Sequence, residues 1–92
     1  MRMSSLALLA VAVPLPTPAL AEEFEAICAY SLAEHGVERK TNCSINWTNP
    51  QTGKTYCFGS DQTKQPFLQD PEENIRKAED IFAKLRKKAV KQ

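Results

Sequence analysis

Residues 42–58 read NCSINWTNPQTGKTYCF, and this stretch decides the fold of the 92-residue chain. Polar and apolar side chains alternate over residues 42–48, as they do in a strand with one buried face. Residues 49–53 contain a proline and a glycine, which favour a turn. Residues 55–58 are β-branched, aromatic or cysteine and suit a return strand. The stretch therefore predicts a β-hairpin.

Symmetric pairing about the turn places large side chains opposite one another, Trp47 with Tyr56 and Ile45 with Phe58. In this register Cys43 faces the core with the aromatic side chains, and Cys57 faces outward. A register shift of one residue would reverse the orientation of Cys57, because successive side chains of a strand point to opposite faces.

A helix is expected before the hairpin, over residues 22–36. Helical spacing places five residues on one side of it: Phe24, Ile27, Cys28, Leu32 and His35. Gly36 suits the left-handed position that commonly ends a helix.

Two helices are expected after the hairpin. Ser60 is a plausible cap for a short helix over residues 60–69, in which Pro66 falls late. Asp70 then caps a long terminal helix, with Pro71 at its first position. An apolar stripe follows down that helix, made of Ile75, Ala78, Ile81 or Phe82, Leu85 and Ala89. The fold class is a small single α+β domain.

The N-terminus has the features of a cleavable signal peptide. Arg2 is followed by an uncharged apolar run, Leu6 to Val13, and by three prolines. Ala19-Leu20-Ala21 matches the small-x-small pattern of signal peptidase sites. The run is far shorter than the roughly 20 residues that span a bilayer, which argues against an uncleaved anchor. We expect residues 1–21 to be removed and an exported domain, periplasmic or secreted, to begin at Glu22.

The charge of the remaining part is balanced. Residues 22–92 contain 11 acidic and 11 basic residues, since Arg2 is the one charged residue removed. A neutral domain without a basic patch argues against nucleic-acid binding. The lysine and arginine side chains near the C-terminus interact favourably with the negative end of the dipole of the terminal helix. This explains them more simply than binding to a membrane surface does. We expect no nucleic-acid partner, and no membrane contact after cleavage.

The remaining domain contains three cysteines, Cys28, Cys43 and Cys57. A domain of this size commonly needs a disulfide, a metal ion or an oligomer for stability, because its hydrophobic core is small. An odd number allows at most one intrachain bridge and leaves one thiol over. We expect Cys28–Cys43, because both lie on predicted apolar faces. Closing that loop of about 16 residues would stabilise the fold by roughly 3 kcal/mol. Cys43–Cys57 is the competing pair, and it would need the shifted register.

A family resemblance is carried by the run GKTYCFGS, residues 53–60. It is followed at matching spacing by Lys64, Phe67, Leu68, Asp70 and Pro71. Residues 42–81 resemble a YHS domain, whose pattern is a GK-x-Y-x-F strand, a Cys-Ser turn and a helix with an aromatic residue and an Asp-Pro step. YHS and the similar TRASH domains are small modules attached to metal transporters, metal sensors and oxygenase subunits. The resemblance implies a metal-binding or metalloprotein-accessory role.

The chain departs from the family at the usual ligand positions, which here are Gly59 and Thr63. The available soft-metal donors are three thiols and one imidazole: Cys28, Cys43, Cys57 and His35. Such donors suit Cu(I) or Zn²⁺. Their spacing contains no Cys-x-x-Cys pair, and His35 alone also fits a solvated residue at a helix C-terminus.

Three hypotheses of function follow. The first is a non-enzymatic exported YHS-like module that binds a metal ion or assists a metalloprotein. The second is a disulfide-stapled domain or small subunit that binds a protein partner without metal. The third is a thiol-redox role for Cys57, which would need a lowered thiol pKa. No nucleophile–base pair can be read from the spacing, so we expect no enzyme.

Overall fold

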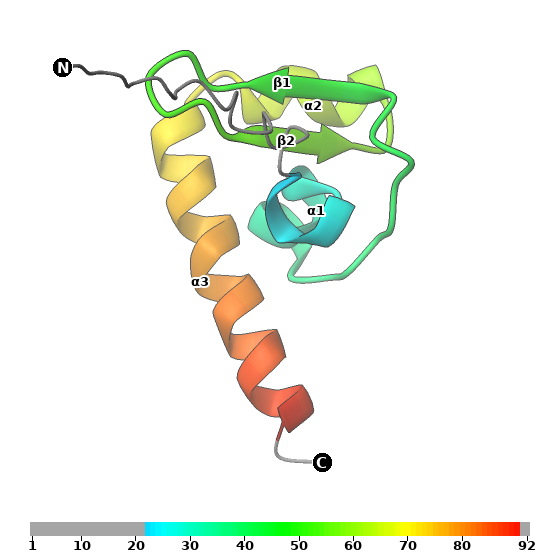
Figure 1. The fold of residues 1–92 in the computed structure, drawn as a ribbon, viewed down its shortest axis with the longest axis vertical. Coiled ribbons are helices and arrows are strands. Elements are labelled where there is room, and N and C mark those ends of the chain that lie inside the picture. Colours follow the sequence, from blue (N-terminus) through cyan, green and yellow to red (C-terminus); the bar gives the residue numbers. More distant parts are fainter. Residues whose placement is uncertain (1–21, 91–92) are drawn as a thin grey trace, which may run out of the picture.

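The computed structural model describes residues 22–90 (Figure 1). The predicted signal segment, residues 1–21, lies outside the described residues, so its removal stays a prediction. Within the described part, three α-helices and a two-stranded antiparallel hairpin form the small α+β domain expected from the sequence. Among these residues, no helix combines the length and the apolar character needed to cross a membrane.

The hairpin consists of β1 (Ile45–Thr48) and β2 (Thr55–Phe58). Its register confirms the two predicted cross-strand pairs, Trp47 with Tyr56 and Ile45 with Phe58. The turn is closed by a hydrogen bond from the Asn49 amide to the Lys54 carbonyl, 2.8 Å long. Gly53 has φ +77°, the left-handed conformation for which a glycine is suited.

Strand β2 is bordered on both edges. One edge pairs with β1, and the other contacts the N-terminal segment through two isolated parallel bridges, Glu22 with Thr55 and Cys28 with Cys57. All four residues of β2 are buried, whereas β1 alternates between half-buried and exposed. The N-terminal segment therefore covers a strand edge that the hairpin alone would leave open.

The expected helix over residues 22–36 is wrong in its first half. Glu23–Ala26 form a short 3-10 element, η2, in which Phe24, Glu25 and Ala26 all have positive φ, between 57° and 65°. Helix α1 begins only at Ala29 and ends at His35 (Ala29–His35). The segment departs from a right-handed helix because it runs along β2 and delivers Phe24 to the core, where its ring lies 5.8 Å from that of Tyr56.

The predicted apolar face of this region is confirmed in part. Phe24, Ile27, Cys28 and Leu32 are buried, but His35 is exposed. The segment before Ala29 is not α-helical, so the predicted face that begins at Phe24 does not continue along α1 to His35. Gly36 ends α1 with φ +65°, as expected.

The two later helices begin as predicted. Helix α2 (Asp61–Phe67) is capped by Ser60, whose hydroxyl accepts from the Thr63 amide while the Thr63 hydroxyl accepts from the Ser60 amide. Helix α3 (Pro71–Val90) follows Asp70, whose carboxylate accepts a hydrogen bond of 3.4 Å from the Glu73 amide. Figure 1 shows α3 running past α1, and these two helices share the largest helix–helix contact.

The core lies between the aromatic face of the hairpin and the helices. It contains Phe24, Ile27, Cys28, Ala29, Leu32, Tyr56, Phe58, Phe67 and Ala78. Phe58 and Phe67 meet edge to face with ring centroids 5.1 Å apart, which joins β2 to α2.

Candidate metal centre

The disulfide joins Cys43 to Cys57, with their Cα atoms 4.8 Å apart. The expected bridge Cys28–Cys43 is therefore wrong, and Cys28 is the free cysteine. The pair Cys43–Cys57 forms in the predicted register, without the shift of one residue that strand alternation would require. The reason is that Cys43 precedes β1 and has φ +60°, so the side-chain alternation of the strand does not extend to it.

The outward orientation predicted for Cys57 is correct in direction but not in exposure. By strand alternation, Cys57 points away from the face that carries Tyr56 and Phe58. It is nevertheless fully buried, with a relative exposure of 0 %. Cys43 covers Cys57 on this face through the disulfide, and the N-terminal segment covers the adjacent edge of β2.

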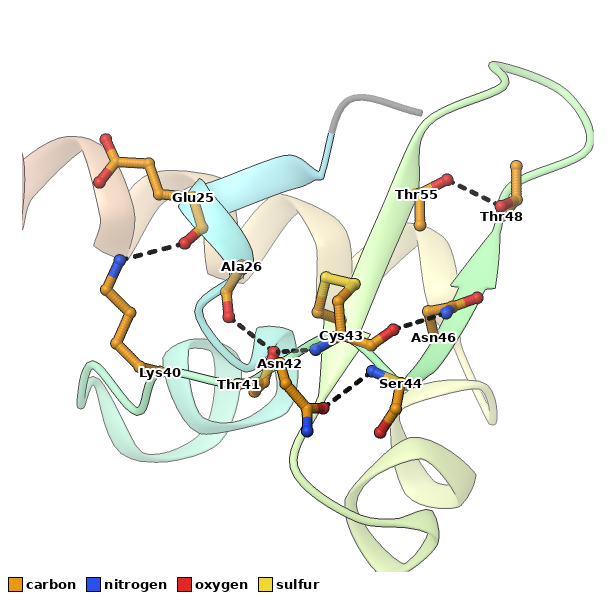
Figure 2. The surroundings of a disulfide bond; sticks show 11 residues. Glu25, Ala26, Lys40, Thr41, Asn42, Cys43, Ser44, Asn46, Thr48 and Thr55 are labelled. Atoms are coloured by element: carbon orange, nitrogen blue, oxygen red, sulfur yellow. Dashed lines mark hydrogen bonds between the residues drawn. A yellow bond between two sulfur atoms is a disulfide. The ribbon is translucent and has the colours of Figure 1, made fainter. Parts of the chain in front are cut away.

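A set of hydrogen bonds holds Cys43 in its left-handed conformation (Figure 2). The Thr41 hydroxyl donates to the Ala26 carbonyl at 2.7 Å and accepts from the Cys43 amide at 3.1 Å. On the other side, the Asn46 side chain donates to the Cys43 carbonyl at 2.7 Å. Cys43 is thus tied both to the N-terminal turn and to β1.

Glu22 completes a cluster with the two cysteines. One carboxylate oxygen of Glu22 and the sulfur atoms of Cys43 and Cys57 all lie within 4.8 Å of one another. Glu22 is exposed, while both cysteines are buried, so the cluster opens to solvent on the side of the carboxylate. Two thiolates and a carboxylate are donors that Zn²⁺ accepts, and the thiolates suit Cu(I). Both sulfurs are available as ligands only after the disulfide is reduced.

The other two predicted ligands lie apart from this cluster. Cys28 is 2 % exposed and points toward α2, where its sulfur lies 3.9 Å from the Thr63 hydroxyl oxygen. His35 is exposed at the end of α1, and its ring packs edge to face on Tyr30 at 5.7 Å. Among the described residues, neither belongs to the Glu22–Cys43–Cys57 group.

Sequence reasoning missed Glu22. Its position is set by the bridge to Thr55, a contact between segments more than thirty residues apart. No local sequence motif predicts such a contact. The sequence offers no direct signal for it beyond its place next to the predicted cleavage point.

A separate groove lies between the hairpin turn and the junction of α2 with α3. Its volume is about 370 Å³, and Trp47, Pro50 and Pro71 are among the residues that line it. Trp47 is half-buried and stacks on Tyr56 with ring centroids 6.0 Å apart. The aromatic face of the hairpin therefore reaches the surface at this groove.

Tyr56 itself is inert as an acid or base at neutral pH. Burial raises its pKa to about 12, and the nearby carboxylates of Glu23 and Glu79 add to the shift. The phenol stays protonated and serves as part of the core.

Comparison with known proteins adds no relative. No protein-family model matches the chain, and neither the curated proteins nor the solved structures contain a match.

Proposed function

We propose that this chain is an exported, non-enzymatic YHS-like module whose Glu22–Cys43–Cys57 cluster binds a soft or borderline metal ion, Zn²⁺ or Cu(I), when the disulfide is reduced. The module acts in the periplasm or outside the cell, as a metal-binding domain or as an accessory to a metalloprotein. The observation that carries the proposal is the convergence of three donor atoms within 4.8 Å.

The spacing of the two cysteines suits a metal. A tetrahedral zinc site with Zn–S bonds of about 2.3 Å holds two sulfurs about 3.8 Å apart. The Cα atoms of Cys43 and Cys57 are 4.8 Å apart, so rotation of the two side chains can open the disulfide to that separation without moving the backbone far. The Glu22 carboxylate then provides a third ligand on the open side of the site.

The resemblance to YHS domains supports the same reading, although the ligands differ. Gly59 and Thr63 occupy the usual ligand positions, and Thr63 is engaged in capping α2 with Ser60. In this chain the two thiols come from the loop before β1 and from β2 instead. The proposed site therefore uses other positions of the chain than the family's usual ligand pair.

The test is a metal titration of the reduced domain, residues 22–92, against a chelator of known affinity. We expect saturable one-to-one binding of Zn²⁺ or Cu(I) that is lost in Cys57→Ser and in the oxidised protein, because a thiolate is required. Cys28→Ala and His35→Ala are the matched controls, since each removes a donor outside the cluster. Both should bind as the parent does.

Equal, weak binding by the parent and by Cys57→Ser would contradict the metal-binding role. Loss of binding in Cys28→Ala or His35→Ala would instead favour the broader ligand set that the sequence suggested. Native mass spectrometry of the same samples reports the metal stoichiometry and the disulfide count together.

One observation favours the second candidate, a disulfide-stapled interaction domain without metal. The Cys43–Cys57 bridge is formed and is almost wholly buried, as a permanent staple would be. In that case the groove beside Trp47 is the surface to examine for a protein partner. The titration above separates the two candidates, because a staple needs no metal in either redox state.

A further inference from the structure

The groove beside Trp47 has a lining that suits one kind of ligand. Figure 1 shows the turn of the hairpin beside the start of α3, where the groove lies. Its volume of about 370 Å³ is near the lower end of the roughly 300–1,000 Å³ typical of ligand pockets. The lining combines an indole ring, two prolines and side-chain amides with the carboxylates of Asp70 and Glu72. Within the described part of the chain, no lysine, arginine or histidine contributes to it.

The aromatic wall of the groove is held in a fixed position. Trp47 pairs with Tyr56 across the hairpin, and the two rings stack with an interplanar angle of 28°. Tyr56 is buried, whereas Trp47 is half-buried and lines the groove. A tryptophan face attracts a cation more strongly than a tyrosine or phenylalanine face does. Because the ring is already packed, little side-chain freedom is lost when a ligand binds to it.

The two carboxylates of the groove have no cationic partner. Asp70 and Glu72 are exposed, and among residues 22–90 neither takes part in an ion pair, whereas the neighbouring Glu73 pairs with Arg76. The start of a helix favours an anion in general. Here the Asp70 carboxylate already accepts from the Glu73 amide, and Pro71 has no amide hydrogen to offer. A cationic ligand therefore suits this end of α3 better than an anionic one.

We propose that the groove binds a lysine or arginine side chain from an extended segment of a partner protein. The cationic group meets the carboxylates of Asp70 and Glu72, and the aliphatic part of the same side chain packs on Trp47 and the two prolines. This inference goes beyond the proposed metal-binding function and does not depend on it. It specifies the chemistry of the partner for the alternative in which the domain is an interaction module.

A second copy of this chain is a poorer occupant. It offers exposed lysines near the end of α3, at Lys84, Lys87 and Lys88. These side chains stand on a helix, and a helix is about 10–12 Å across with its side chains. A groove of about 370 Å³ accommodates one or two side chains of an extended segment more readily than the end of such a helix.

The test uses the fluorescence of Trp47, which is the one tryptophan of the chain and so reports on the groove directly. The oxidised, metal-free chain is titrated with acetylated and amidated pentapeptides of sequence Gly-Pro-X-Pro-Gly, in which X is lysine, glutamine or glutamate. We expect a saturable change with the lysine peptide and roughly tenfold weaker binding of the glutamine peptide at low salt. The preference for lysine should decrease as salt is added, because salt screens exposed charges.

A charge-neutral variant of the groove keeps the helix cap. The double variant Asp70→Asn and Glu72→Gln removes both negative charges, and asparagine caps a helix about as well as aspartate does. We expect this variant to lose the preference for the lysine peptide. Glu79→Gln is the matched control, because Glu79 is also exposed on α3 but does not line the groove. It should bind the peptides as the parent does.

Three results would overturn the inference and leave the metal-binding proposal untouched. The first is equal binding of the lysine and glutamine peptides by the parent, and the second is an unchanged preference in the double variant. The third is the absence of any saturable change of Trp47 fluorescence. A change that depends on protein concentration without any peptide would assign the groove to a second copy of the chain, which also overturns the inference.

Discussion

Phe24 and Phe82 lie with their ring centroids 5.4 Å apart, and this contact joins the left-handed turn at the N-terminus to helix α3. The ring of Phe24 also meets Tyr56 of β2, so one side chain links three elements. Left-handed backbone costs an ordinary residue about 1–2 kcal/mol. Burial of the Phe24 ring, together with the hydrogen bonds that the Ala26 carbonyl accepts from Thr41, helps to offset that cost.

The strain in this turn can be measured at Glu25, which is exposed and has φ +57°. We expect Glu25→Gly to be more stable than Glu25→Ala by about 1 kcal/mol, because glycine adopts positive φ without a steric cost. Both variants lack the carboxylate, so their difference isolates the backbone. The pair Glu79→Gly and Glu79→Ala, in the right-handed helix α3, should show the opposite order by a similar amount. Denaturant unfolding of the four variants gives the comparison, and the same order at both positions would contradict the left-handed turn.

The disulfide should account for a large share of the stability. Cys43 and Cys57 are 14 residues apart, and closing a loop of this length stabilises by about 3 kcal/mol in the chain-entropy model. We expect Cys43→Ala to lower the free energy of unfolding by about that amount under oxidising conditions, and reductant to have little further effect. The control, Cys28→Ala, should remain sensitive to reductant. Peptide mapping that found Cys28 in a bridge would show that the pairing is wrong.

Arg86 connects α3 to two segments that precede the hairpin. Its guanidinium pairs with Glu38 and with Glu25 and lies 4.8 Å from the centre of the Phe82 ring. We expect Arg86→Gln to lower the free energy of unfolding by about 1 kcal/mol, since it removes two ion pairs and a cation–π contact.

The matched control is Lys84→Gln on the same helix. Among residues 22–90, Lys84 pairs with Asp80 alone, and both side chains are more than half exposed. Its loss should cost less than about 0.5 kcal/mol. Thermal unfolding at low and high salt measures both variants, and equal losses would mean that Arg86 does not hold the N-terminal turn and the following loop against α3.

Tyr56 should make the domain sensitive to alkali. Its pKa is raised from 10.0 to about 12 in the folded protein, first by burial and then by the carboxylates of Glu23 and Glu79. The unfolded state therefore loses its proton first as the pH rises. The stabilising contribution of Tyr56 is complete below about pH 10 and is lost progressively toward about pH 12. Urea unfolding at several pH values should show this decline, and Tyr56→Phe should flatten it. An unchanged slope in that variant would assign the alkaline loss to other groups.

Local sequence signals were sufficient for the hairpin and the later helices. Alternation over residues 42–48 and the turn at Asn49 fixed the register, and Ser60 and Asp70 marked the helix starts. These signals work because each depends on neighbours in the chain. The prediction for the N-terminal region was wrong for the opposite reason. Residues 22–28 have the apolar pattern of a helix, but their pairing with β2, which is distant in the sequence, decides their conformation.

The candidate site was predictable only in its residue types. The sequence predicts Cys43 and Cys57 as ligands but favours a different disulfide, because the alternation of a strand does not apply to Cys43, which lies outside β1 with φ +60°. His35 was included because it shared a helical face that the structure does not form. Glu22 was not named, because its approach to the cysteines depends on a long-range bridge.

The burial of Cys57 limits when its sulfur can react. An oxidant cannot reach a sulfur that is fully covered, so the thiols must react before residues 22–28 dock along β2, or during a local opening of that segment. The hairpin joins near neighbours and can form early, whereas the N-terminal pairing joins residues about 30 positions apart and is expected later. Oxidant and metal ion compete for the same two sulfurs, but only the proposed metal site also needs Glu22 and hence the docked N-terminal segment.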